Sequence, residues 1–70
     1  MSIYKTIGAN IKKYRQMKDL SQDQLAAKAG MDRSYLAKIE AGQRNFSLGV
    51  LESIANALKV GIMDLMDGIN

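Results

Sequence analysis

The chain has 70 residues, with ten Lys or Arg against seven Asp or Glu, and it contains no Cys, His or Pro. Without Cys or His it lacks disulfides, thiolate metal ligands and the commonest catalytic base, so we expect no enzyme, no metal site and no cofactor. No apolar run reaches the roughly 20 residues that span a bilayer, and the N-terminus has no signal-peptide core. We therefore expect a cytoplasmic protein without membrane contact.

Apolar residues at helical spacing predict an all-α fold of five helices in a single domain, residues 1–70. The first helix is expected over about residues 3–18, with the lysines of this segment mostly off its apolar face. That apolar face carries Ile3, Ile7, Ile11 and Tyr14.

A second helix is predicted from residue 21. Ser21 fits its N-cap and Gln24, three residues on, is the matching capping-box partner. Gly30 suits the left-handed residue that ends a helix, and Met31 follows as an apolar plug.

A third helix is predicted to run from the N-cap Asp32 to about Ala41 and to bury Leu36 and Ile39. Its opposite face must then point outward and carries Arg33, Ser34 and Lys38. Residues 21–41 therefore have the layout of a helix-turn-helix, in which the second helix enters a DNA major groove.

The remaining chain predicts a loop from Gln43, with Phe46 anchored in the core, and a fourth helix that Ser47 caps and that stops near Val60. The buried face of this helix is expected to be Leu48, Leu51, Ile54, Ala55 and Leu58. A last short helix, residues 62–66, is more apolar than one core-facing turn requires, and Met at helical spacing is usually core or interface rather than a binding groove. We place a dimerisation region at 47–69, with an interface of Ile62, Met63, Leu65 and Met66.

Charge is divided along the chain. Residues 1–46 hold nine Lys or Arg against four acidic residues, giving +5, whereas residues 47–70 hold only Lys59 against three acidic residues, giving −2. A basic surface attracts a polyanion, although the same charge also fits an ordinary solvent-exposed surface without a partner. The basic part coincides with the helix-turn-helix, which favours DNA as the partner.

Three segments carry a resemblance in their order and spacing: LSQDQLA at 20–26, IEAGQRNFSL at 39–48 and LESIANALKV at 51–60. Over residues 3–66 the chain resembles the lambda Cro and cI (Xre) helix-turn-helix family. Within that family it looks most like the controller proteins of restriction-modification systems, which commonly carry a D-R-T-Y-I run and then an R-N pair. Residues 32–36 and 44–45 correspond to these motifs, with Ser34 in place of Thr and Leu36 in place of Ile. Serine keeps the hydroxyl of threonine but lacks the methyl group that could contact a thymine.

The resemblance implies a compact five-helix lambda-repressor-like domain and a sequence-specific transcriptional regulator that binds a near-palindromic operator in double-stranded DNA as a homodimer. The residues expected to contact DNA are Gln22, Arg33, Ser34, Tyr35, Lys38, Gln43, Arg44 and Asn45. Arg33 is placed to read a guanine, with phosphate or solvent contact as the alternative. Tyr35 can pack its ring beside the preceding helix and still reach a phosphate, Lys38 suits a phosphate, and Gln22 starts a helix whose N-terminus favours a phosphate.

The resemblance also implies that Arg15 pairs with Glu40 as a structural contact, and that Asp23 matches an acidic position through which relatives touch RNA polymerase. A phage-type repressor or an antitoxin acting through a protein partner is the alternative function, although antitoxins usually carry an extra segment. A peripheral membrane binder would need an amphipathic helix with a basic face, which is missing. Asp64 and Asp67 have no His, Cys or Gly-rich loop nearby, so catalysis is not expected.

Overall fold

Five α-helices follow one another in the computed structural model, which describes residues 2–69, and no strand occurs among these residues. They are α1 (Ile3–Met17), α2 (Gln22–Ala29), α3 (Arg33–Glu40), α4 (Leu48–Leu58) and α5 (Ile62–Leu65). The predicted all-α, five-helix fold is therefore confirmed, with helix ends within a residue or two of those expected. None of the helices in the described range is long and apolar enough to cross a membrane.

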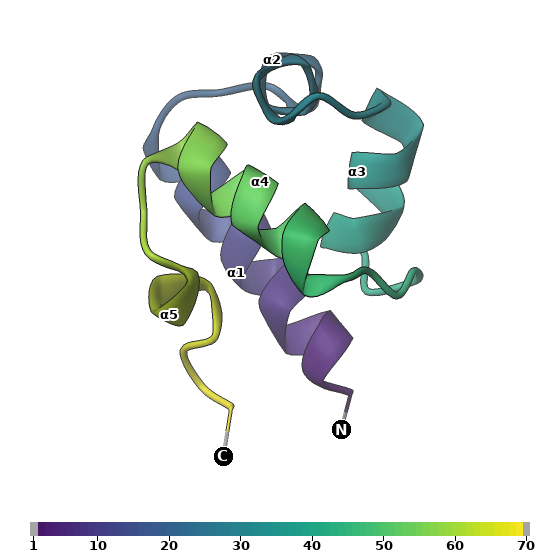
Figure 1. Cartoon of the computed structure of the whole chain (residues 1–70), viewed down its shortest axis with the longest axis vertical. Helices are drawn as coiled ribbons and strands as arrows, with labels where there is room; N and C mark the ends of the chain where they lie inside the picture. Colours follow the sequence, from purple (N-terminus) through teal and green to yellow (C-terminus); the bar gives the residue numbers. More distant parts are fainter. Residues whose placement is uncertain (1, 70) are drawn as a thin grey trace.

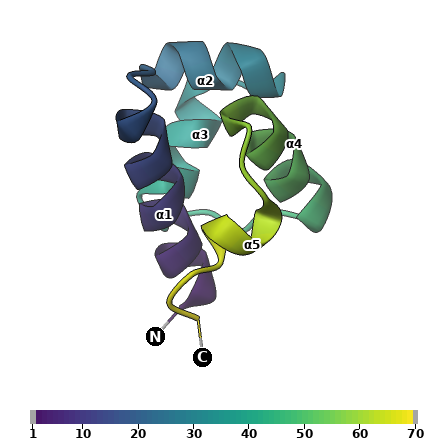
Figure 2. The ribbon, with the colours of Figure 1, turned by 90° about the vertical axis from the view of Figure 1, so that its left-hand side faces the viewer.

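The long helix α1 packs against α3, α4 and α5, and α2 packs against α3 and α4. Figures 1 and 2 show α2 lying across one end of the bundle, with α5 and both ends of the chain toward the opposite end. The helix α2 therefore lies at the end of the molecule opposite α5.

Local signals in the sequence set the helix ends. Ser21 Oγ accepts a hydrogen bond from the Gln24 backbone N–H (3.0 Å), and Gln24 Oε1 accepts one from the Ser21 backbone N–H (2.8 Å). This is the predicted capping box, which satisfies two donors at the start of α2. Gly30 ends α2 in the left-handed conformation with φ of 72°. Asp32 lies at the N-cap of α3 as expected, but its side chain makes no capping hydrogen bond.

The core is a single cluster of apolar side chains drawn from every helix. Its buried members are Ile7, Ile11, Leu25, Ala26, Leu36, Ile39, Leu51, Ile54, Ala55, Leu58 and Leu65. Met31 and Phe46 pack against this cluster from the turn and the loop, as predicted.

Two residues expected on buried faces lie outside the core: Leu48 is 73% exposed and Ile3 is 50% exposed. Both begin a helix. Half-buried Phe46 and Val50 already cover the core beside the start of α4, so Leu48 lies beyond the packed side chains. Tyr4, rather than Ile3, reaches the same region, since its ring meets Phe46 edge-on at 5.0 Å.

The prediction that Leu65 belongs to a dimer interface is wrong, because its side chain is fully buried in the core of its own chain. Asn10 of α1 explains this placement: its Nδ2 donates to the carbonyl oxygens of Leu65 (2.9 Å) and Asp67 (2.8 Å). These bonds hold the end of α5 against α1, where the Leu65 side chain packs in the core. Met63 is 80% exposed, whereas Ile62 and Met66 are half-buried against the core.

Candidate nucleic-acid interface

The helix α3 is fixed against α1 by a very close approach. A Cβ atom added at Gly8 would overlap the carbonyl oxygen of Ile39 and meet the carbonyl oxygen of Glu40 at 3.0 Å. Glycine is therefore required where the last turn of α3 crosses α1. The last turn of α3 is held in the fold, whereas Arg33 and Ser34 at its start are exposed.

A buried ion pair also joins the end of α3 to α1. Arg15 Nε donates to Glu40 Oε2 at 2.7 Å and Nη2 donates to Glu40 Oε1 at 3.0 Å, while Nη1 donates to the Leu20 carbonyl oxygen at 2.8 Å. Arg15 and Glu40 are only 9% and 7% exposed. The predicted Arg15–Glu40 pair is thus confirmed, and its two-pronged geometry gives it directional specificity.

Gln22 belongs to this cluster as well, because its Nε2 donates to Glu40 Oε1 at 3.2 Å. One hydrogen of its side-chain amide is therefore used inside the protein, a contact that the sequence did not suggest. The second amide hydrogen remains, and the first N–H groups of a helix have no partner within the helix. The start of α2 therefore keeps donors suited to a phosphate oxygen.

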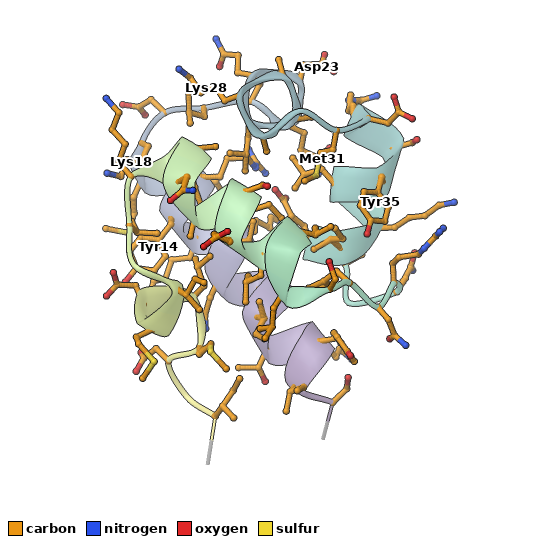
Figure 3. The ribbon with its side chains drawn as sticks, in the orientation of Figure 1. Tyr14, Lys18, Asp23, Lys28, Met31 and Tyr35 are labelled. Atoms are coloured by element: carbon orange, nitrogen blue, oxygen red, sulfur yellow. The ribbon has the colours of Figure 1, made fainter. Side chains whose placement is uncertain are left out.

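The outward face of α3 carries the polar residues expected there. Arg33, Ser34 and Lys38 are exposed, and Tyr35 is half-buried with its ring against the core cluster. Figure 3 shows Tyr35 on α3. The Tyr35 ring therefore packs as part of the fold, and contact of its hydroxyl with a phosphate stays a prediction.

The loop after α3 folds back beside it. Gly42 has φ of 72°, and the Gln43 backbone N–H donates to the Lys38 carbonyl oxygen at 2.9 Å, which closes the helix. The Arg44 guanidinium then lies over the Tyr35 ring, with Cζ 5.3 Å from the ring centroid. The exposed loop residues Gln43, Arg44 and Asn45 thereby lie next to the exposed face of α3.

The structure adds a further contact that sequence patterns missed. Arg33 Nε lies 3.4 Å from Asp23 Oδ1, and the two side chains are 64% and 76% exposed. Asp23 is in the first turn of α2 and Arg33 is the first residue of α3. Figure 3 shows Asp23 on the side of α2 nearest the start of α3. Opposite charges at these two positions are visible in the sequence, but their contact depends on the angle between the two helices.

Nothing in this region suggests metal chemistry. Among residues 2–69 no three Asp or Glu side chains gather into a group that could hold a metal ion. The exposed groups of α3 and its loop are instead cations, amides and hydroxyls, which are the donors that bind phosphates and base edges.

Comparison with known proteins agrees with this geometry. A family model described as helix-turn-helix matches residues 11–65. The control protein C.MunI of a Mycoplasma species is 43% identical over 63 residues, which cover 89% of this chain and 85% of that protein. An immunity repressor of Bacillus phage phi105 is 47% identical over 57 residues, which cover 81% of this chain but only 40% of the repressor.

A solved structure of a controller protein has a similar fold. The restriction-modification controller protein C.Esp1396I, crystallised as a tetramer with its natural 35 base-pair operator, superposes with a TM-score of 0.86 at 30% identity. The match covers 94% of this chain and 91% of that one. The sequence resemblance to Xre-type and controller proteins is confirmed, and the chain belongs to the helix-turn-helix family of DNA-binding transcription regulators.

Proposed function

We propose that this protein regulates transcription by placing α3 in the major groove of a specific operator, and that it serves as a controller protein of a restriction-modification system. The observation that carries the proposal is the rigid, outward face of α3 beside the Arg44 loop, held by the buried Arg15–Glu40 pair. The similarity to a control protein and to a controller bound to its operator supports the same function.

Each polar group has a proposed task on DNA. Arg33, on the first turn of α3, reads a guanine through O6 and N7, and Ser34 contacts an adjacent base or phosphate. Lys38 and the start of α2 at Gln22 bind phosphates. In the loop, Arg44 reaches a base edge or the backbone, with Gln43 and Asn45 beside it.

We further propose that the protein binds as a homodimer. Half-sites of such operators lie about 34–36 Å apart, whereas the longest dimension of this chain is 30 Å and it has one recognition helix. Two copies are therefore needed to fill successive grooves. Exposed Met63, flanked by half-buried Ile62 and Met66, is the proposed contact, at the end of the molecule away from α2.

Contact with RNA polymerase through Asp23 completes the proposal. Asp23 is 76% exposed on α2, so its carboxylate is accessible on the upper surface of the bundle in Figure 3. An Asp23→Asn variant should lose activation of a promoter. Operator titration of the same variant must accompany the transcription assay, because Asp23 also contacts Arg33.

The test of the proposed function is selection of operators from random double-stranded DNA, followed by mobility-shift titration. A near-palindrome with half-site centres one helical turn apart is expected. Failure to enrich any sequence would overturn the proposal and favour a protein partner, as in an antitoxin. A phage-type repressor is the second candidate, supported by the phi105 similarity. The genomic position of the selected operator, upstream of an endonuclease gene or of phage genes, separates the two.

A further inference from the structure

Among residues 2–69, Asp23 is the one acidic side chain within ion-pair distance of Arg33. The Arg33 Nε lies 3.4 Å from Asp23 Oδ1, while the Arg33 side chain is 64% exposed. An exposed ion pair of this kind contributes little to folding stability. The ion pair instead influences the direction in which the Arg33 guanidinium points.

A guanidinium can bind acceptors along its Nε side or through its two terminal nitrogens. The side that Asp23 occupies therefore decides which N–H groups remain for DNA. The contact is made through Nε, which leaves the terminal Nη1 and Nη2 groups available to another acceptor. Two parallel N–H groups at that end match the O6 and N7 acceptors of guanine in the major groove. A free arginine at the same position could equally turn toward a phosphate.

The negative charge of Asp23 also disfavours contact between Arg33 and phosphates. A carboxylate next to the guanidinium repels phosphate oxygens, so it weakens binding that depends on the backbone alone. Guanine presents neutral acceptors and suffers less from this repulsion. Discrimination of this type combines an attractive contact with a repulsive one against the wrong target.

We propose that Asp23 is a specificity-determining residue that positions Arg33 for a guanine edge and away from phosphates. The inference rests on the proposed function, since it concerns the same face of α3. Asp23 does not itself touch a base in this arrangement. It acts through Arg33.

The experiment is a titration of three DNA duplexes by fluorescence anisotropy: the selected operator, the operator with 7-deazaguanine at its guanines, and a random duplex. Asp23→Asn should lower the ratio of operator to random affinity by about threefold, mainly through tighter binding of random DNA. It should also reduce the penalty caused by 7-deazaguanine, which lacks the N7 acceptor. Asp23→Glu should restore most of both effects.

A double-mutant cycle separates this role from a general charge effect. In an Arg33→Ala background, Asp23→Asn should leave the affinity ratio unchanged. Asp32→Asn is the matched control, because Asp32 is exposed beside Arg33 in sequence and forms no ion pair with any described residue. It removes the same charge and should shift all duplexes equally.

The inference is overturned if Asp23→Asn leaves the ratio intact, or if it lowers the ratio equally with and without Arg33. Both results are compatible with a wild-type protein that selects an operator, so the proposed function would survive them. A wild-type protein without any preferred duplex would instead overturn the proposed function and this inference together.

Discussion

The Arg44 guanidinium lies over the face of the Tyr35 ring, with Cζ 5.3 Å from the ring centroid. Tyr35 is half-buried on α3, whereas Arg44 is exposed in the loop that follows. Attraction between a cation and an aromatic face is worth about 0.5–1 kcal/mol at an exposed site. The contact therefore links the recognition helix and its loop into one surface.

Two substitutions at Tyr35 separate its hydroxyl from its ring. Tyr35→Phe keeps the ring and should cost about 0.5–1.5 kcal/mol of affinity on every DNA sequence, through the loss of one phosphate hydrogen bond. Tyr35→Ala also frees Arg44 and should cost about 0.5–1 kcal/mol more. Anisotropy titrations in an Arg44→Ala background provide the check. The role of the ring is refuted if its removal there costs as much as in the wild type.

Arg33 and Lys38 are both exposed on α3 but should give different signatures. Arg33→Ala should lose about 1–3 kcal/mol on the operator and little on random DNA, because it removes a base contact. Lys38→Ala should weaken all sequences alike and make the slope of log K against log salt shallower by about one unit. Equal losses for Arg33→Ala on both kinds of DNA would make Arg33 a phosphate contact, and an unchanged slope would remove Lys38 from the interface.

Two helical glycines should respond in opposite ways to alanine. Gly8→Ala drives a methyl into the carbonyl of Ile39 and should destabilise the fold by about 1–3 kcal/mol, the usual range for overpacking. At Gly49 an added methyl meets only Ser47 Oγ, at 3.7 Å. Gly49→Ala should therefore stabilise the protein by about 0.5–1 kcal/mol through helix propensity. Urea unfolding measures both; a Gly8→Ala variant as stable as the wild type would show that α1 and α3 can separate freely.

Several features of the fold and of the candidate site were predictable from the sequence. The capping box of Ser21 and Gln24 and the left-handed Gly30 were predictable because they depend on chemistry within a few residues. The Arg15–Glu40 pair came from family resemblance, and the structure confirms it. For the candidate site, the sequence placed Arg33, Ser34 and Lys38 correctly on the outward face of α3.

The errors have a common physical origin. Leu48 fits the helical period of α4 and is nevertheless exposed, since periodicity does not tell where neighbouring side chains end. Leu65 was assigned to an interface, yet its side chain is buried in the core, and its carbonyl oxygen accepts a hydrogen bond from Asn10, 55 residues earlier. The Asp23–Arg33 contact likewise depends on how two helices are oriented, which local spacing does not specify.

The buried Arg15–Glu40 pair predicts a marked difference between single and double substitutions. Glu40→Ala leaves a buried guanidinium without its carboxylate and should destabilise the fold by about 3–5 kcal/mol. A combined Arg15→Met and Glu40→Leu variant has no unpaired charge and should be more stable than Glu40→Ala. Thermal unfolding followed by circular dichroism gives the comparison. If the double variant is the less stable of the two, polar contacts such as the one from Gln22 outweigh the unpaired charge.

The exposed side chain of Met63 predicts the site of dimerisation. Met63 is 80% exposed, so Met63→Lys should leave the fold of each chain intact while placing a charge in the proposed apolar contact. Sedimentation should then show monomers, and affinity for the full operator should fall because the two half-sites are no longer linked. Met17→Lys is the matched control, since Met17 is 68% exposed at the far end of α1 and should leave the dimer unchanged. Leu65→Ala should behave differently, unfolding more easily by about 2–5 kcal/mol because it opens a cavity in the core. A wild-type chain that sediments as a monomer well above its operator affinity, or a Met63→Lys variant that remains dimeric, would place the interface elsewhere.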